Sequence, residues 1–453
     1  MATRGTKKSS GDDGSAGLSA SADELLLRAA ERGDDSLHTG RFIVTFKEGA
    51  TDDEMQTLGR LAGDLRVANA RDFSEEAVSL EDVADADALV FPEIGAALVS
   101  GTAAEARGVS AFAEVDSDSA IESIDPELFV FADSILDDLS AQTAYRGAAD
   151  GRQGDYLRGF LHAAATIAED LGGESSAILT PEEEVEVAGA TWGLAACRVP
   201  QSLRSGAGIK VAVLDTGFNI GHPDFAGRPI VGQTFVGQPV QDLNGHGTHC
   251  TGTACGTKVP PGSTPRYGIG HQAAIHIGKV LTNSGSGTQS QVLAGMNWAI
   301  AQRCQVISMS LGSQAGVQPS YTAAGRSALN VGCLIVAAAG NAGSQTGAPA
   351  NSPTIFSVAS LDSNLRPSSF SNFGKVEVAA PGRDVFSSWP MPVRYKAISG
   401  TSMATPHVAG CAALWAQTSA NLRGLALWRQ LQTRARRLPF SSARVGTGLV
   451  QAP

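Results

Sequence analysis

The 453-residue chain is poor in aromatic residues and has fewer basic than acidic residues. Aromatic residues make up 6% of it, and its formal net charge is −11 at pH 7. Nucleic-acid-binding proteins need a basic patch, so this balance argues against a nucleic-acid partner. No apolar run reaches the roughly 18 residues of a membrane-spanning helix, and we therefore expect no membrane association.

The N-terminus also lacks the apolar core of a secretory signal. Residues 1–10 are followed by Gly, Asp and Ser, so we expect a cytoplasmic rather than a secreted protein. Cysteines are few, and they lack the dense spacing of a disulfide framework. The six are Cys197, Cys250, Cys255, Cys304, Cys333 and Cys411. We expect mostly free thiols in a reducing compartment, with one or two disulfides as the alternative.

Glycine, in contrast, is abundant, with 52 residues. Glycine together with many alanines suits the tight strand-to-helix turns and close packing of a doubly wound α/β fold. The chain is also longer than one ordinary domain and long enough to bury a sizeable core. These features are typical of an enzyme built on alternating strands and helices.

The most informative stretch covers residues 400–410, Gly-Thr-Ser-Met-Ala-Thr-Pro-His-Val-Ala-Gly. It places Ser402 between small residues where a helical pattern begins. A serine hydroxyl is a poor nucleophile unless a base takes its proton and the backbone leaves room for a substrate carbonyl. Gly400 and Ala404 leave that room, so Ser402 is a candidate nucleophile.

Three other polar residues complete a catalytic set. Asp215 ends an apolar strand pattern, His246 lies between glycines at the start of a small-residue helix, and Asn341 follows another apolar strand. These types predict that Ser402 attacks while His246 acts as base and then as acid. Asp215 would orient the imidazole. Asn341 and the backbone N–H of Ser402 would stabilise the oxyanion.

The order Asp215, His246, Ser402, with Asn341 before the serine, resembles that of the subtilisin-like serine proteases, the subtilases. The resemblance covers about residues 191–450. It implies a doubly wound parallel-sheet α/β catalytic domain that hydrolyses peptide bonds of proteins through a Ser402 acyl-enzyme. The pair His249-Cys250 is similar to the proteinase K branch, in which a free cysteine lies under the catalytic histidine.

The resemblance also implies a substrate-binding cleft. Residues 306–312 are similar to the family strand that pairs with the substrate backbone and walls the primary specificity pocket. The expected lining residues are Ser310, Leu311, Gly312, Ala338, Ala339 and Gly340. The resemblance implies a preference for large apolar or aromatic groups in this pocket, and none of these lining residues is charged. Many relatives bind calcium, but this sequence suggests no ligand set, and we predict no required cofactor and no metal site.

Several alternatives deserve comparison. His246, His249, Cys250 and Cys255 could ligate zinc, but zinc-protease helices carry His-Glu-x-x-His, which is absent here. The Gly-x-Ser-x-Gly elbow of α/β-hydrolases is not met at Ser402. A catalytically silent peptide-binding relative is disfavoured because all four catalytic positions are filled. A narrow-specificity maturation protease or transpeptidase that acts on one partner peptide remains open.

The part before the catalytic unit divides into three segments. We predict a disordered polar N-terminus over 1–37, with a short helix at 22–32. Residues 38–133 show a β-α-β-β-α-β pattern, the ferredoxin-like α+β arrangement. Residues 134–186 form a linker with one helix, and 187–453 form the peptidase domain.

The 38–133 pattern resembles subtilase propeptides. The resemblance implies a domain that assists folding and acts as an intramolecular inhibitor of an autoprocessed zymogen. Its tail would add to the enzyme as an extra strand. A small adaptor domain is the alternative. Processing is expected near residue 133, near 180 in the acidic linker, or at both, and the enzyme is expected to be a monomer.

Overall fold

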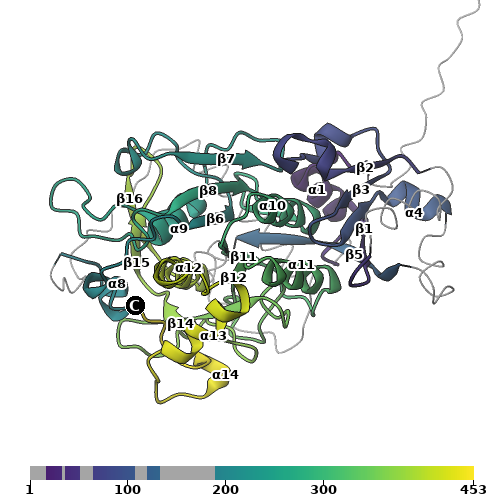
Figure 1. Ribbon diagram of the computed structural model, residues 1–453. Helices are drawn as coiled ribbons and strands as arrows, with labels where there is room; N and C mark the ends of the chain where they lie inside the picture. Colours follow the sequence, from purple (N-terminus) through teal and green to yellow (C-terminus); the bar gives the residue numbers. More distant parts are fainter. Residues whose placement is uncertain (1–16, 33–35, 51–64, 108–119, 133–188) are drawn as a thin grey trace, which may run out of the picture.

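The computed structural model describes residues 17–32, 36–50, 65–107, 120–132 and 189–453. These parts form a large α/β unit and a smaller N-terminal unit packed against it (Figure 1). The linker helix predicted within 134–186 lies outside the described residues. Among the helices in the described parts, none has the length and apolarity to cross a membrane.

The large unit is built on a sheet of seven strands in the order β14-β13-β12-β10-β6-β8-β7. All neighbours in this sheet are parallel. The strands are β6 (Lys210–Asp215), β7 (Ile230–Thr234), β8 (Ala274–Lys279), β10 (Val306–Met309), β12 (Leu334–Ala338), β13 (Phe356–Leu361) and β14 (Val378–Pro381). Most are continuous apolar runs, which suits a sheet covered on both faces.

Helices cover the two faces of this sheet (Figure 1). They are α9 (His246–Cys255) and α12 (Thr401–Thr418) on one face, and α10 (Gln289–Ala301) and α11 (Pro319–Asn330) on the other. In β6, Val211 and Val213 pack with α9 and α12, whereas Ala212 and Leu214 pack with α10 and α11. This alternation confirms the predicted doubly wound α/β fold.

The remaining elements of the large unit lie around this core. They are α8 (Trp192–Ala196), α13 (Gly424–Arg434), α14 (Ser442–Val445), and the hairpin of β15 (Val385–Ser388) and β16 (Tyr395–Ile398). Near the C-terminus, the backbone pairing consists of isolated bridges. Leu449 pairs with Ala379 and with Arg436 but is not part of a named strand.

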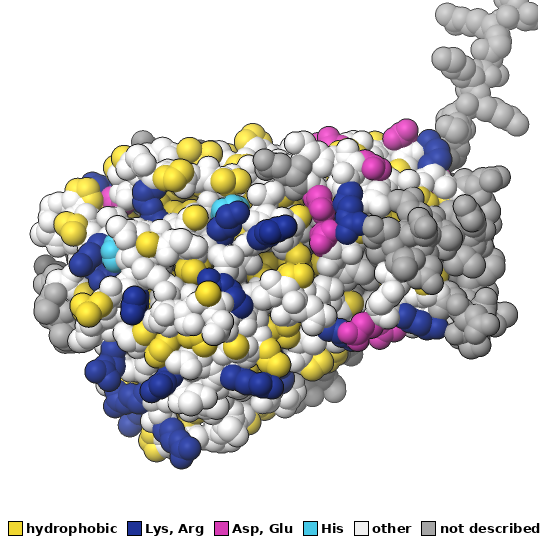
Figure 2. Space-filling view, in the orientation of Figure 1, with side chains coloured by type: hydrophobic (Ala, Val, Ile, Leu, Met, Phe, Trp, Pro, Cys, Tyr) yellow, Lys and Arg dark blue, Asp and Glu magenta, His cyan; other side chains and the backbone are white. Residues whose placement is uncertain are grey.

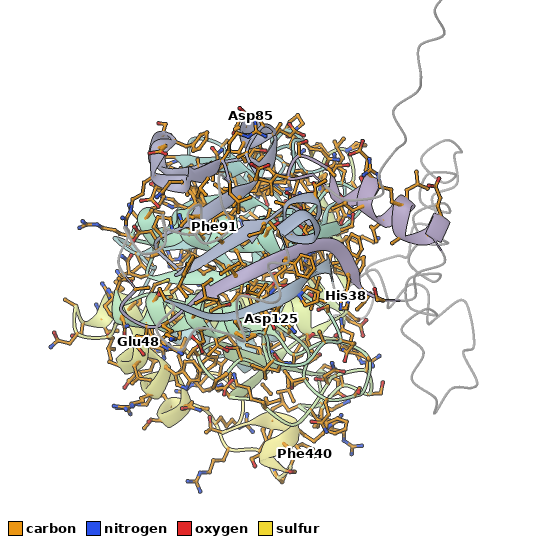
Figure 3. All side chains as sticks on the ribbon, turned by 90° about the vertical axis from the view of Figure 1, so that its right-hand side faces the viewer. His38, Glu48, Asp85, Phe91, Asp125 and Phe440 are labelled. Atoms are coloured by element: carbon orange, nitrogen blue, oxygen red, sulfur yellow. The ribbon has the colours of Figure 1, made fainter. Side chains whose placement is uncertain are left out.

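The N-terminal unit contains a second sheet, which Figure 3 shows from its outer side with β1 between the labelled His38 and Glu48. Its strands are β1 (His38–Phe46), β2 (Val67–Asn69), β3 (Ala88–Phe91), β4 (Ala96–Val99) and β5 (Ile121–Ala132), and α4 (Gly101–Arg107) follows β4. They are ordered β5-β1-β4-β3-β2. The three-residue β2, parallel to β3, was not predicted because so short a segment has no readable periodicity.

The last part of β5 leaves its own unit and lies between two strands of the large unit, β9 (Ser286–Thr288) and β11 (Leu311–Gly312). Val130 is opposite Gly287, and Phe131 is opposite Gly312, both in antiparallel pairing. The Ala132 N–H also donates to the Gly285 carbonyl at 2.9 Å. One backbone ladder therefore joins the two units.

The short helix that we predicted within the polar N-terminal segment is confirmed. Helix α1 (Ala22–Arg32) lies at the predicted residues and is packed against the rest of the protein. Leu25, Leu26 and Ala29 are buried against β5. The polar composition suggested disorder because the apolar surface that stabilises this helix belongs to a strand about 100 residues away in the sequence.

Candidate active site

Asp215 and His246 meet at the carboxyl edge of the large sheet. Asp215 is the last residue of β6, and His246 is the first residue of α9. The Asp215 Oδ1 atom lies 2.7 Å from His246 Nδ1 and also accepts the Thr216 N–H at 2.7 Å. Gly245 ends the preceding turn with φ of 107°, and a Cβ there would collide with the Trp389 ring. The end of β6 and the start of α9 thus bring Asp215 and His246 together inside the protein.

The electrostatic environment makes the His246 imidazole more basic than usual. Burial by itself lowers the pKa of His246, but the neighbouring Asp215 carboxylate outweighs it and holds this pKa well above its usual value. The other ring nitrogen, Nε2, is buried and has no hydrogen-bond partner. A buried polar atom without a partner needs an explanation, and proton transfer is one that this chemistry supplies.

Ser402 lies at the N-terminus of α12, behind the N-cap residue Gly400. Its Oγ donates to the Ser310 carbonyl at 3.2 Å, while Ser310 Oγ donates to the Ser402 carbonyl at 2.7 Å. The Cys250 sulfur connects the two catalytic elements, at 3.6 Å from the Ser402 carbonyl oxygen and 4.0 Å from His246 Nδ1. The structure therefore brings the serine and histidine segments around one thiol.

Asn341 is oriented by the turn that precedes the serine. Its Oδ1 accepts from the Thr401 backbone N–H at 2.8 Å and from Thr401 Oγ1 at 2.9 Å. The amide nitrogen then faces Gly400, where a Cβ would lie 3.2 Å from Asn341 Nδ2. Unpaired backbone N–H groups and a positive dipole end also characterise the first turn of a helix. This corner can therefore stabilise a negative oxygen near Ser402.

The residues expected to bind substrate lie along two neighbouring segments. Ser310, Leu311 and Gly312 are buried in and beside β11, and β5 occupies the backbone positions of this strand. Ala338, Ala339 and Gly340 lie at the end of β12 and are buried as well. The Gly340 N–H donates to Thr401 Oγ1 at 3.1 Å, which connects this segment to the serine turn.

Two further residues were missed by sequence reasoning. The fully buried Asp242 accepts from Thr216 Oγ1 at 3.0 Å and from the Thr248 N–H at 2.9 Å. It therefore joins the turn after Asp215 to the first turn of α9. The available signal was a carboxylate four residues before His246, a position from which it can accept N–H groups at a helix start.

Lys279 is the other missed residue. It ends β8, donates to the Thr216 carbonyl and lies 2.9 Å from Asn283 Oδ1. Burial lowers the pKa of Lys279 to about 8, while the Asp242 and Asp215 carboxylates oppose the shift. No sequence motif marks this lysine, because only the fold brings the end of β8 next to the turn after β6.

The histidines and cysteines of the alternative zinc site do not form one cluster. Among the described residues, the cluster with ligand atoms within 4.8 Å of one another is Asp215, His246 and Cys250. His249 instead donates from Nε2 to the Val385 carbonyl at 2.8 Å, and burial lowers its pKa to about 3. All six cysteines are buried and free, as the composition predicted.

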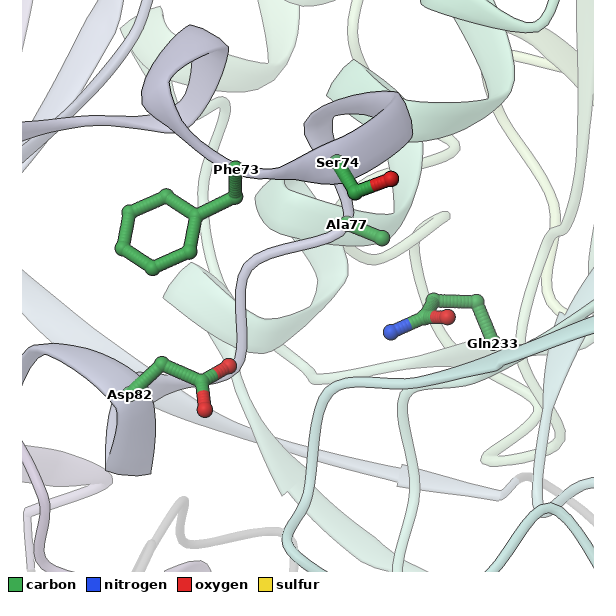
Figure 4. Close-up of a pocket in the computed structure, with 5 residues that line it drawn as sticks. All are labelled: Phe73, Ser74, Ala77, Asp82 and Gln233. Carbon is green, nitrogen blue, oxygen red and sulfur yellow. The ribbon is translucent and has the colours of Figure 1, made fainter.

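A hollow of about 510 Å³ lies away from these residues (Figure 4). It is lined by Phe73, Ser74, Ala77, Asp82 and Gln233, between β7 and the 3-10 turns that follow β2. No predicted catalytic residue lines it. This hollow is therefore separate from Leu311 and Gly312, the expected substrate-binding residues that pair with β5.

Comparisons with known proteins agree with this geometry. Residues 206–448 match the family model described as the subtilase family. The chain is 43% identical to Thermitase of Thermoactinomyces vulgaris over 50% of this chain and 83% of that protein. It is 39% identical to Subtilisin Savinase of Lederbergia lenta over 58% of this chain and 96% of that protein. A crystal structure of a cold adapted subtilisin-like serine proteinase matches with 36% identity and a TM-score of 0.52, covering 58% of this chain and 99% of that one.

The fold and these matches define a serine protease with the subtilisin-like α/β fold. The chain belongs to the subtilase family, and it is a serine endopeptidase.

Proposed function

We propose that this chain is the zymogen of an endopeptidase that uses Asp215, His246 and Ser402, and that its own N-terminal unit inhibits it. The observation that carries the proposal is the position of β5. Its end pairs antiparallel with Leu311 and Gly312, the residues expected to bind the substrate backbone. A strand added to an exposed edge is a common mode of peptide recognition. The segment therefore occupies the cleft as a substrate would.

In the proposed reaction, the Ser402 hydroxyl turns from the Ser310 carbonyl toward His246 Nε2. The imidazole takes its proton as Oγ attacks the peptide carbonyl, and Asp215 stabilises the imidazolium that forms. Asn341 and the Ser402 N–H hold the oxyanion. His246 then gives the proton to the leaving amine as the C–N bond breaks. In the second half, His246 takes a proton from water, the water oxygen attacks the acyl-enzyme, and the proton passes to Ser402 Oγ as the ester bond breaks.

The N-terminal unit has the strand order that a ferredoxin-like propeptide would have. Without the added β2, the order is β5-β1-β4-β3, with β1 antiparallel to both β4 and β5. The unit packs on α10 and α11 and makes an ion pair to the large unit, Arg326 to Glu48 at 3.3 Å. We assign it the role of propeptide, with processing near residue 133, directly after the strand that fills the cleft.

Within the cleft, two residues of β5 point toward the enzyme. Val130 and Ala132 pack in the core that also contains Leu281, Val292 and Leu311. We propose that Ser310–Gly312 and Ala338–Gly340 wall the primary pocket and that its lack of charge selects apolar groups. The closer relation to the proteinase K branch rests on Cys250, whose thiol lies under the His246 ring.

Processing can be tested on the full chain by intact mass, N-terminal sequencing of the fragments and ion exchange. Residues 134–453 hold 23 Lys and Arg against 17 Asp and Glu, a formal charge of +6, whereas residues 1–133 hold 11 against 28, or −17. Figure 2 shows basic side chains spread over the large unit on one face. The fragments should therefore separate cleanly at pH 7 once their contact is broken.

Inhibition can be tested with Val130→Asp. This change places a carboxylate in the apolar contact of β5 and should shorten the delay before processed enzyme hydrolyses a peptide, by at least about tenfold. The matched control is Glu122→Gln at the exposed end of the same strand, which should keep the wild-type delay. An uncut wild-type chain, or an equal delay in both variants, would contradict the proposal.

Asn341→Ala should lower kcat by roughly 10²–10³-fold with little change in KM. The reason is that its amide nitrogen acts on the oxyanion and not on the ground-state carbonyl. Thermal unfolding should be followed in parallel, because Asn341 Oδ1 also holds the Thr401 turn. Unchanged turnover in a folded variant would remove Asn341 from the mechanism.

The pH dependence follows from the raised pKa of His246. The imidazole acts as a base only when it is neutral, so kcat/KM should fall as the pH drops through this pKa. Because the shift is upward, the midpoint of the acid limb should lie above the usual value of about 6.5. A pH–rate profile of processed enzyme measures it, and a midpoint below 6 would contradict the assignment.

A further inference from the structure

We propose that residues 18–32, containing helix α1, form a clasp that holds the cleft-filling end of β5 in place and so sets its rate of release. The proposal rests on the proposed function, since it takes β5 to be the inhibitor of the cleft. It adds a second element, upstream of the inhibitory sheet, that controls how long inhibition lasts.

Apolar side chains are buried on the face of β5 that points away from Val130 and Ala132. Alternate residues of a strand point to opposite sides, so Phe129 and Phe131 lie opposite Val130 and Ala132. A strand bound in a cleft alone would leave such outward rings in water. Here Phe129 and Phe131 are at most 2% exposed, in a cluster whose α1 members are Leu25, Leu26 and Ala29. Helix α1 thus covers the outer face of the strand.

The helix is also attached directly to the wall of the cleft. Asp23, in the first turn of α1, accepts from Ser286 Oγ at 2.8 Å and from Ser284 Oγ at 2.9 Å. Ser286 belongs to β9, the strand that pairs with Phe131. A carboxylate at this end of a helix is favoured by the helix dipole. The clasp therefore contacts both the inhibitor and the enzyme.

A buried arginine connects the segment before α1 to the same place. Arg41 Nη1 donates to the Leu18 carbonyl at 2.9 Å, and Nη2 donates to Thr288 Oγ1 at 3.2 Å. Its Nε pairs with Glu127 of β5 at 2.6 Å, and both side chains are fully buried. Removing one partner of such a pair would leave an uncompensated buried charge, so these connections resist being broken singly.

These contacts predict a slow release. For β5 to leave the cleft, α1 must either separate from the phenylalanine rings or move with them and lose its contacts to Ser284 and Ser286. Both routes break interactions that a propeptide without this helix would lack. The clasp should therefore lengthen the time for which the processed enzyme stays inactive.

The test compares the buried and exposed leucines of the helix. In the full chain, Leu25→Ala with Leu26→Ala should speed the appearance of peptidase activity after processing by on the order of 100-fold, because two buried side chains are lost from the contact. Leu27 is 57% exposed, so Leu27→Ala is the matched control and should behave as wild type. Asp23→Asn, with Glu31→Gln as control, should give a smaller gain of about five- to tenfold.

The outcomes separate the clasp from the inhibitor. If the double leucine variant and Asp23→Asn keep the wild-type delay while Val130→Asp shortens it, the proposed clasp is wrong and the proposed inhibition by β5 is supported. If the wild type has no delay and Val130→Asp changes nothing, both proposals fail.

Hydrogen exchange in the uncut Ser402→Ala chain distinguishes loss of the clasp contact from general unfolding of the N-terminal unit. The double substitution Leu25→Ala with Leu26→Ala should speed exchange at the amides of Phe129 and Ala132 but not at those of β3 and β4. Unchanged protection of Phe129 and Ala132 would also overturn the clasp.

Discussion

Replacing Ser402 by alanine should abolish peptide hydrolysis and leave the chain at its full mass of 46.5 kDa. The hydroxyl is the proposed nucleophile, and the hydroxyl of the neighbouring Ser310 is already used to hold the Ser402 carbonyl. We expect kcat to fall by on the order of 10⁵-fold or more, the size of effect seen when a triad serine is removed. The measurement is initial rate on an aromatic-P1 peptide, together with intact mass over time.

Ser363→Ala is the matched control, because this serine is exposed on the large unit. It should process and hydrolyse as the wild type does. If the Ser402→Ala chain is still shortened when purified to homogeneity, a different protease makes the cut and the autoprocessing part of the proposal fails. If it also retains turnover, the nucleophile is another residue.

Changing Asp215 to asparagine should lower kcat by about 10⁴-fold while KM stays within a few-fold of the wild type. Asp215 Oδ1 accepts both from His246 Nδ1 and from the Thr216 N–H. An amide can keep a similar shape, but it can leave the imidazole in the wrong tautomer and cannot stabilise the imidazolium. Substrate binding should be spared because Asp215 is buried behind the histidine.

A second readout separates this role from a loss of structure. Without the carboxylate, the effect of burial on His246 is opposed much less, so its pKa should fall and the acid limb of kcat/KM should move to lower pH. A variant that merely unfolds would lose active enzyme without moving the limb, which titration with an active-site reagent would reveal. A kcat within tenfold of the wild type would exclude the assigned role of Asp215.

Local sequence accounts for much of the large unit. Strand β6, with its run from Lys210 to Asp215, and the helix that begins after Gly400 were predicted at or within a residue of where they occur. Such runs are readable because a strand buried on both faces needs continuous apolar residues, and a glycine turn leaves a clear signal. The approach of Asp215 to His246 followed from the order of motifs that the family shares.

Other features depend on contacts between distant residues. Helix α1 was predicted at its observed residues, but no local pattern around Ala22 could show that it packs with Phe129 and Phe131. The role of Asp242 likewise appears only when β6 and α9 are placed side by side. In both cases the stabilising partner is remote in sequence, so its contribution to the free energy of folding is invisible to local propensity.

The sequence by itself was enough to identify the proposed reactive groups, because nucleophile, base, acid and oxyanion donor each need a particular side chain beside a glycine turn or a strand end. Only the tertiary structure showed that β5 fills the expected substrate cleft and so separates those groups from water. The pairing of Phe131 with Gly312 and the seating of Leu25 on that strand join residues separated by 181 and about 100 positions. Such contacts arise from the burial of surfaces that meet only after both units have folded.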